Sequence, residues 1–230
     1  MQNILITGSS KGIGKAIALK LASKDSHIFI HGRDQKGLAD TSREIGNKGG
    51  QATQIIADIS TPEGCEKLFQ GVGQTSLDAL INNAGIPMKK PLSELTLNDW
   101  NKTVAVNVTA PFLITQKFLP RLKKGSAIVY ILSGAAKHVF PDATAYCMSK
   151  FALRGFAEAL REELRPKGIR VINIFPSSVD TPLWEAMPGN WPREKMMVPN
   201  DVAEAVAFAL SCRDVVMVDD ITIENIAGRL

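Results

Sequence analysis

Residues 3–14 read Asn-Ile-Leu-Ile-Thr-Gly-Ser-Ser-Lys-Gly-Ile-Gly. The first five have the short apolar pattern of a buried strand, and residues 12–24 continue with apolar side chains at helical spacing. Between them lies a glycine-rich turn, where the backbone can bend sharply and approach a bound group closely. A buried strand, a glycine turn and a helix in this order predict one unit of a parallel α/β sheet.

The same alternation continues along the chain. Strand patterns occupy residues 3–7, 27–31, 52–57, 77–82, 127–132, 169–175 and 220–224, and helical patterns occupy 12–24, 35–48, 62–72, 97–123, 143–166 and 200–211. We therefore expect an α/β fold with a single Rossmann-like, doubly wound parallel sheet of about seven strands and helices on both faces. Because the sequence contains no linker or repeat, residues 1–230 are expected to form one domain.

Composition excludes several classes of protein. Hydrophobic residues make up 45% and charged residues 22% of the 230, which is ordinary globular composition. The net charge of +4 comes from scattered lysines and arginines, so no nucleic-acid partner is expected. The sequence contains no run of about 18 apolar residues, so no membrane span is predicted. With no secretory leader pattern and with three widely spaced cysteines, we expect a cytoplasmic protein.

The segment 177–199 breaks the strand–helix rhythm. It holds four prolines together with Trp184, Met187 and Trp191. Proline prevents one continuous helix, and a loop this long in a compact domain is more often functional than idle. We interpret the segment as a flap over a substrate pocket. The alternative is a surface segment that packs only on its own domain or on a second subunit.

The glycine turn lies where a ligand is expected. Ligands of open parallel sheets bind beyond the carboxyl ends of the strands. The free amide groups and the dipole of the following helix favour a pyrophosphate there. The spacing Thr-Gly-x-x-x-Gly-x-Gly at residues 7–14 differs from Gly-x-Gly-x-x-Gly. Taken alone, this turn is also compatible with a tight strand–helix connection that binds nothing.

Four further motifs follow in a fixed order. Residues 82–85 read Asn-Asn-Ala-Gly, Asn107 lies in a predicted helix, Ser133 follows the fifth strand, and Tyr146 precedes Lys150 in a Tyr-x-x-x-Lys motif. Together with the glycine turn, they make nearly the whole chain similar to the short-chain dehydrogenase/reductase family in its compact, single-domain form.

The resemblance implies hydride transfer between a nicotinamide cofactor and a carbonyl or alcohol substrate. This covers reduction of ketones or aldehydes, 3-oxoacyl thioesters included. Tyr146 would act as general acid or base, and Ser133 would hydrogen-bond the substrate oxygen. Lys150 would hold the nicotinamide ribose, and Asn107 would orient a water molecule linked to Lys150. The alternative is a non-catalytic NADP(H)-binding sensor or interaction protein on the same fold.

The spacing of Tyr146 and Lys150 has a physical reason. An unperturbed tyrosine has a pKa of about 10, and a residue four positions later lies on the same helix face. A lysine ammonium favours the tyrosinate form. Lowering the tyrosine pKa by about three units takes ~4 kcal/mol, which one charge supplies at ~4 Å in an effective dielectric of about 20. We therefore expect Lys150 to lower the pKa of Tyr146.

The end of the second strand bears on the choice of cofactor. Asp34 lies at the distance from the glycine turn at which an acidic residue is expected to hold an unphosphorylated ribose. In the family, however, the acid of NAD-dependent members falls at Gly32, and Arg33 follows it here. Arg33 and Lys11 suit a 2′-phosphate, so NADP(H) is favoured over NAD(H). The alternative is that Arg33 is a solvated charge and NAD binds instead.

The complete set of candidate cofactor contacts combines the glycine turn with positions matched to the family. They are Gly8, Ser10, Lys11, Gly12, Ile13, Gly14, Arg33, Asp58, Ile59, Asn83, Ala84, Gly85, Tyr146, Lys150, Pro176, Val179 and Thr181. One departure is Ser177, which stands where the family usually has glycine. A serine fits there only if its backbone angles suit an L-residue.

Three further expectations concern partners and alternative sites. His27 and His31 lie four residues apart on a predicted strand, about 13 Å, too far to share a metal ion, so no metal site is expected. Tyr130 is interpreted as a core residue. The resemblance implies a small-molecule substrate and a homodimer or homotetramer, with the helices 97–123 and 143–166 as interface candidates.

Overall fold

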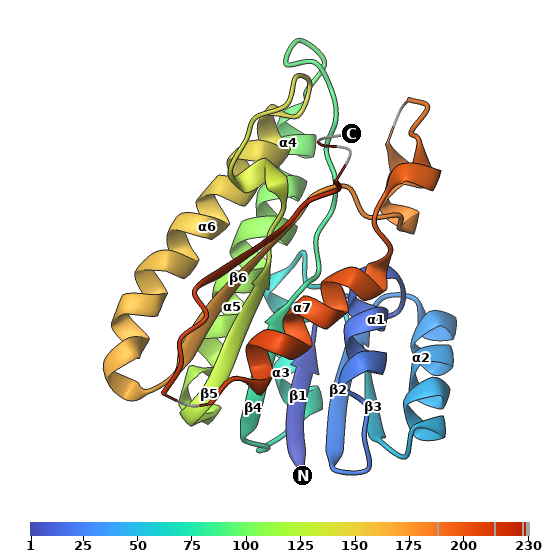
Figure 1. Cartoon of the computed structure of the whole chain (residues 1–230). Coiled ribbons are helices and arrows are strands. Elements are labelled where there is room, and N and C mark those ends of the chain that lie inside the picture. Colours follow the sequence, from blue (N-terminus) through green and yellow to red (C-terminus); the bar gives the residue numbers. More distant parts are fainter. Residues whose placement is uncertain (188, 214, 227, 229–230) are drawn as a thin grey trace.

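Seven parallel strands form one sheet in the order β3-β2-β1-β4-β5-β6-β7 (Figure 1). The computed structural model describes residues 1–187, 189–213, 215–226 and 228. The strands are β1 (Gln2–Ile6), β2 (Ser26–Gly32), β3 (Gln51–Ile56), β4 (Leu77–Asn82), β5 (Leu122–Ile131), β6 (Arg170–Pro176) and β7 (Asp220–Ile223). This topology confirms the predicted doubly wound fold, with the change of direction between β1 and β4.

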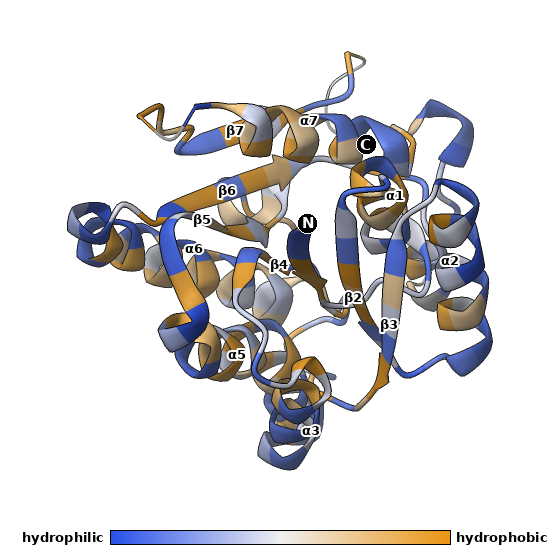
Figure 2. Ribbon diagram, turned by 90° about the horizontal axis from the view of Figure 1, so that it is seen from below, coloured by the Kyte–Doolittle hydropathy of each residue, from blue (hydrophilic) through white to orange (hydrophobic). Residues whose placement is uncertain are grey.

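Helices cover both faces of the sheet, as predicted (Figure 2). One face carries α1 (Gly12–Leu21), α2 (Gln35–Asn47) and α7 (Pro199–Ser211), and the other carries α3 (Pro62–Val72), α5 (Ala110–Phe118) and α6 (Thr144–Leu164). Successive strand residues point to opposite faces, so Ile4 and Ile6 pack in one core and Leu5 in the other. Within the described residues, no helix has the length and apolar character needed to cross a membrane.

The prediction of one helix over residues 97–123 is wrong. This stretch contains α4 (Leu97–Val104), a π-helical segment at Ala105–Thr109, α5 and a 3-10 turn at Leu119–Arg121. Pro111 lies in the first turn of α5 and has no N–H, so the carbonyl four residues before it loses its α-helical donor. The wider turn adapts to this loss. The strand β5 already begins at Leu122, which pairs with Leu77 of β4.

The segment predicted to be a flap contains two 3-10 turns, Pro182–Ala186 and Arg193–Lys195. The indole Nε1 of Trp184 donates to the carbonyl of Val179 at 2.7 Å, and its ring lies 4.7 Å from that of Trp191. Pro188, which the predicted flap includes, lies outside the described residues. The segment is therefore fastened to the end of β6 through Trp184.

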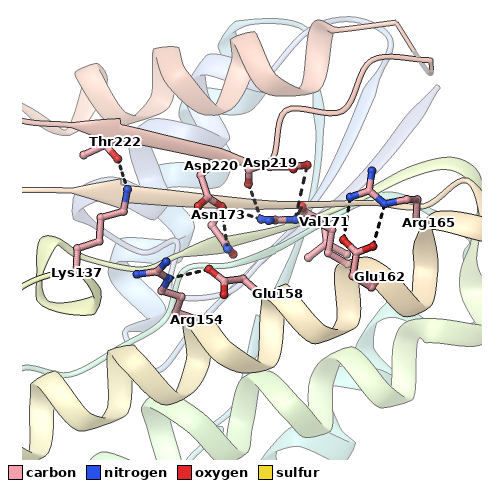
Figure 3. Close-up of polar contacts among 11 residues, drawn as sticks. Lys137, Arg154, Glu158, Glu162, Arg165, Val171, Asn173, Asp219, Asp220 and Thr222 are labelled. Carbon is pink, nitrogen blue, oxygen red and sulfur yellow. Dashed lines mark hydrogen bonds and ion pairs between the residues drawn. The ribbon is translucent and has the colours of Figure 1, made fainter.

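A buried arginine attaches the edge strand β7 to the body of the protein (Figure 3). Arg161 of α6 donates from Nε to the carbonyl of Val171 at 2.9 Å. Its Nη2 donates to the carbonyl of Asp219 at 2.6 Å and to Oδ1 of Asp220 at 2.8 Å. Asn173 of β6 donates to the same Asp220 oxygen at 3.2 Å. One side chain therefore links a helix with two neighbouring strands.

Replacing Arg161 with leucine is expected to lower the free energy of unfolding by about 2–4 kcal/mol, because several charge-assisted hydrogen bonds are lost at a buried position. Urea unfolding followed by circular dichroism measures this change. The matched control is Arg165→Leu, whose ion pair with Glu162 is exposed to solvent and should contribute little to stability. Equal losses in both variants would contradict the role given to Arg161.

Candidate active site

A cavity of about 890 Å³ opens at the carboxyl ends of the strands. Its wall includes most of the candidate residues from the sequence, namely Gly8, Ser10, Lys11, Gly12, Ile13, Arg33, Asp58, Ile59, Asn83, Ala84, Gly85, Ser133, Tyr146, Lys150, Pro176, Val179 and Thr181. Trp184, Met187 and Trp191 of the flap segment also line it. Gly14 and Asn107 do not line the cavity and lie behind its wall.

The glycine turn packs too closely for side chains at two positions. Gly8 has a φ of +67°, in the left-handed region that favours glycine. A Cβ added to Gly14 would lie 2.3 Å from the carbonyl oxygen of Gly8 and 2.5 Å from Nδ2 of Asn83. Gly14 therefore lets α1 approach the end of β1 and does not itself face the cavity.

Side chains lock the ends of β1 and β4 together beneath this turn. The amide Nδ2 of Asn83 donates to the carbonyls of Thr7 and Gly8, both at 2.9 Å. In return, Oγ1 of Thr7 accepts from the backbone N–H groups of Asn83 and Ala84, both at 3.0 Å. Thr7 is 1% exposed, and its role was not predicted. The signal was its place between the apolar strand and the first glycine.

The first turn of α1 leaves donors for a bound anion. The helix begins at Gly12, and Lys11 before it provides no side-chain cap. The first amide groups of the helix therefore have no intrahelical or capping acceptor, which is the usual arrangement at a phosphate site. Lys11 and Arg33 supply positive charge along the same cavity wall. These residues fit a pyridine dinucleotide.

Asp34, the acidic residue identified by its distance from the glycine turn, has a structural role instead. Asp34 precedes α2 and accepts from the backbone N–H of Gly37 at 3.1 Å, so it caps that helix. Arg33 lies 3.7 Å from Asp58 in an exposed ion pair, which binds Arg33 only weakly. A Cβ on Gly32 would come within 3.2 Å of Oγ of Ser10. A side chain at Gly32 would therefore be in close contact with Ser10.

Ser133, Tyr146 and Lys150 meet at the other end of the cavity. Oγ of Ser133 accepts from the N–H of Ala135 at 3.1 Å, and Ser133 also hydrogen-bonds Tyr146. The ammonium group of Lys150 donates to the carbonyl of Ile131 at 3.2 Å. Lys150 is 5% exposed, so its position is fixed by packing as well as by this hydrogen bond.

The predicted effect of Lys150 on Tyr146 is not present in this structure. Burial raises the pKa of Tyr146, while its hydrogen bond with Ser133 acts in the lowering direction. Burial also lowers the pKa of Lys150 to about 8. Nζ of Lys150 lies 5.8 Å from the centre of the Tyr146 ring, and both groups are withdrawn from water. Desolvation therefore dominates both groups.

Asn107 supports the site from behind. Its Oδ1 accepts from the N–H of Ile86 at 2.9 Å, and its Nδ2 donates to the carbonyl of Ile86 at 3.0 Å and to Oγ of Ser149 at 3.1 Å. Ser149 in turn donates to the carbonyl of Tyr146 at 2.7 Å. The side chain thus links the loop after Gly85 to the helix that carries Tyr146. That Asn107 orients a water molecule stays a prediction.

The departure at Ser177 is accommodated by the backbone. Among the described residues, Asp142 is the only non-glycine with a positive φ, so Ser177 adopts angles open to any L-residue. Its N–H donates to the carbonyl of Ile223 at 2.9 Å, and its Oγ accepts from the N–H of Asn225 at 3.4 Å. Val179 forms a bridge with Met197, which holds the start of the flap segment. Serine therefore preserves this part of the cavity wall.

The two histidines of β2 have separate partners. Nε2 of His27 lies 2.8 Å from Oγ1 of Thr53, while His31 contacts Gly8 and Ala57. Within the described part of the chain, no three metal-binding side chains of His, Cys, Asp or Glu gather at one point. Tyr130, interpreted as a core residue, is fully buried, and its hydroxyl lies 2.7 Å from Oγ1 of Thr115.

Known proteins resemble this chain along most of its length. The family profile described as short chain dehydrogenase matches residues 2–190. Sepiapterin reductase of Chlorobaculum tepidum is 31% identical over 236 residues, which cover 98% of this chain and 96% of the relative. D-threitol dehydrogenase of Mycolicibacterium smegmatis is 30% identical over 220 residues, covering 90% of this chain and 85% of the relative.

A solved structure resembles the fold equally well. The angucycline C-6 ketoreductase LanV with bound NADP has a TM-score of 0.87 and is 29% identical. The similarity covers 96% of this chain and 93% of LanV. The likeness therefore extends over the whole sheet and both layers of helices.

Gly14→Ala is expected to destabilise the protein by about 1–3 kcal/mol, because its Cβ would overlap the Gly8 carbonyl and force backbone shifts. Thermal unfolding of the purified variant measures the loss. The matched control is Gly155→Ala in α6, where an added Cβ meets nothing within 4 Å. That change should stabilise the protein by about 0.4–1 kcal/mol. A tolerated Gly14→Ala would show that the turn is not closely packed.

Proposed function

The chain belongs to the short chain dehydrogenase family of oxidoreductases, and from this we propose that it is an NADP(H)-dependent carbonyl reductase. The reaction is the reduction of a ketone or aldehyde to an alcohol, 3-oxoacyl thioesters included, and it can run in reverse. One observation carries the proposal. Ser133, Tyr146 and Lys150 meet at one end of a cavity whose other end is a glycine turn with free helix amides.

The chain's own residues supply proton transfer and orientation. NADPH, when bound, supplies the hydride. Tyr146 gives its phenolic proton to the substrate oxygen as that oxygen gains negative charge. Oγ of Ser133 accepts from Ala135 and hydrogen-bonds Tyr146, so a substrate oxygen bound between the two hydroxyl groups would receive the Ser133 proton as well. Lys150, buried one helix turn after Tyr146, would hold the nicotinamide ribose, as the family resemblance implies.

Several contacts support NADP(H) in preference to NAD(H). Arg33 and Lys11 line the cavity, and the weak ion pair between Arg33 and Asp58 costs little to open. Gly32 provides no acidic side chain to hold an unphosphorylated ribose. LanV, a solved structure with a similar fold, holds NADP.

The flap segment supports a largely apolar substrate. Trp184, Met187 and Trp191 line the cavity together with Phe140, and Lys89 lies over the Trp191 ring at 4.5 Å. Relatives with similar chains are named for sepiapterin and for an angucycline, so the proposal extends to ketones on ring systems.

A homodimer or homotetramer is part of the proposal. Phe112 of α5 and Phe151 of α6 are 41% and 40% exposed, which is unusual for aromatic side chains on neighbouring helices. Phe112 also contacts Phe156 edge-on, with ring centres 6.0 Å apart. These faces support association through the helices that the family resemblance nominated.

Tyr146→Phe is expected to lower the turnover number by about 10²- to 10⁴-fold, since it removes the proton donor and keeps the ring. Loss of NADPH absorbance is followed with a panel of aldehydes, ketones, diketones and acyl thioesters. Tyr130→Phe serves as the control, because Tyr130 lies in the core and lines no part of the cavity. Equal turnover in Tyr146→Phe and wild type would contradict the assignment. NADPH binding without turnover across the panel would favour the sensor function.

Arg33→Ala is expected to raise the KM for NADPH by about 10- to 100-fold, because a charge-assisted contact to a phosphate contributes about 1.5–3 kcal/mol. The KM for NADH should change much less, since NADH lacks this phosphate. Steady-state kinetics with both cofactors gives the comparison. Arg43→Ala is the control, an exposed arginine on α2 that pairs with Asp40 and does not line the cavity. An equal rise for both cofactors would contradict selection by Arg33.

A further inference from the structure

The side chain of His31 joins three neighbouring strand ends. It is 3% exposed and belongs to the wall of the cavity near Arg33. Its Nδ1 accepts from the backbone N–H of Gly8, at the end of β1, over 3.3 Å. Its Nε2 lies 3.2 Å from the carbonyl oxygen of Ala57, just after β3. The imidazole therefore bridges from β1 to β3 across the end of β2.

Only one protonation state of the ring satisfies both contacts. The Gly8 N–H is a donor and needs an acceptor nitrogen, whereas the Ala57 carbonyl is an acceptor and needs a donor. The neutral imidazole with its proton on Nε2 meets both needs. A proton on Nδ1 would face the N–H of Gly8 and break that contact.

The contact with Gly8 lies where the backbone ladder between β1 and β2 has ended. The last paired residues of β1 and β2 are Ile6 and Ile30. Beyond them, the N–H of Ser9 donates to the carbonyl of His31 at 2.8 Å, and Oγ of Ser9 accepts from the N–H of His31 at 2.9 Å. His31 is therefore itself held on both sides of its backbone. Its ring has one orientation in which to hold Gly8.

The ring holds Gly8 and Ala57, which lie at the start of two segments that line the proposed dinucleotide site. Gly8 opens the glycine turn in a left-handed conformation, and Ala57 directly precedes Asp58, the partner of Arg33. A shift of either backbone would move the helix amides relative to Arg33. We propose that the neutral imidazole of His31 is a positioning residue for the cofactor, fixing the glycine turn relative to the strand end that carries Asp58. This inference rests on the proposed NADP(H)-dependent function.

Burial keeps this ring neutral. Burial lowers the pKa of His31 to about 4, and the nearby Arg33 acts in the same direction. The hydrogen bond with Ala57 and the charge of Asp58 oppose this lowering without reversing it. The unfolded chain binds a proton near pH 6.5, so the bridge stabilises the fold fully above that pH. The stabilisation is lost progressively as the pH falls from 6.5 towards 4.

Direct binding of NADPH to the purified full chain tests the proposal. His31→Leu removes both hydrogen bonds and is expected to raise the Kd for NADPH by about tenfold, as for loss of one or two neutral hydrogen bonds. His31→Asn places an oxygen as many bonds from Cα as Nδ1, so it keeps the acceptor for Gly8 and should recover most of the affinity. His27→Leu is the control on the same strand and should stay within about twofold of wild type.

A second measurement, the pH dependence of unfolding, tests whether the buried imidazole is neutral. Urea unfolding between pH 7 and pH 4.5 should show a steeper loss of stability for wild type than for His31→Leu, which has no imidazole to protonate. Unchanged NADPH affinity in His31→Leu would overturn the positioning role and leave the proposed function intact. A wild-type chain that binds neither NADPH nor NADH would overturn both. Equal pH slopes in wild type and variant would overturn the neutral bridge.

Discussion

The close contact between the ends of β1 and β4 is the constraint on which the site depends. The doubly wound order places β2 on one side of β1 and β4 on the other, so the chain leaves β1 at the point where the sheet changes direction. The side chains of Asn83 and Thr7 take part in four hydrogen bonds across this point, two between these residues and one each with Gly8 and Ala84. Buried backbone N–H and carbonyl groups need hydrogen-bond partners, and these side chains provide them where the strand ladders end.

From this contact the cavity is built outward in two directions. Towards β2 and β3, His31 and Ser9 continue the pairing beyond the ladder, and the glycine turn leads into an uncapped helix. Towards β5, Asn107 holds Ile86 and reaches Ser149 beside Tyr146. Side chains in the cavity wall and behind it thus hold its two halves in place. A hydride-transfer site needs such support, since reacting groups must be held in close register.

Burial sets the electrostatics of the site. Lys150 is almost fully buried and has a backbone carbonyl as its hydrogen-bond partner, so its charged form is disfavoured relative to a lysine in water. Tyr146 is affected in the opposite sense for the same reason, because its charged form is the anion. An isolated ammonium group and phenol at this spacing would interact by charge alone. The tertiary structure removes water from around both groups, and this loss of hydration has the larger effect on their pKa values.

The sequence by itself determined the sheet, its layers and many residues of the cavity wall. Alternating apolar runs and helical periods depend on local spacing, and residues at the carboxyl ends of parallel strands must share one edge, so Gly8, Ser133 and Val179 could be placed together. Only the tertiary structure decided the rest. Pro111 and its neighbours divide a helix that looked continuous, Asp34 caps α2, and Gly14, Asn107 and His31 act through contacts distant in sequence. Sequence periodicity does not predict such contacts, because hydrogen bonds and packing between distant segments form only after the strands are in place.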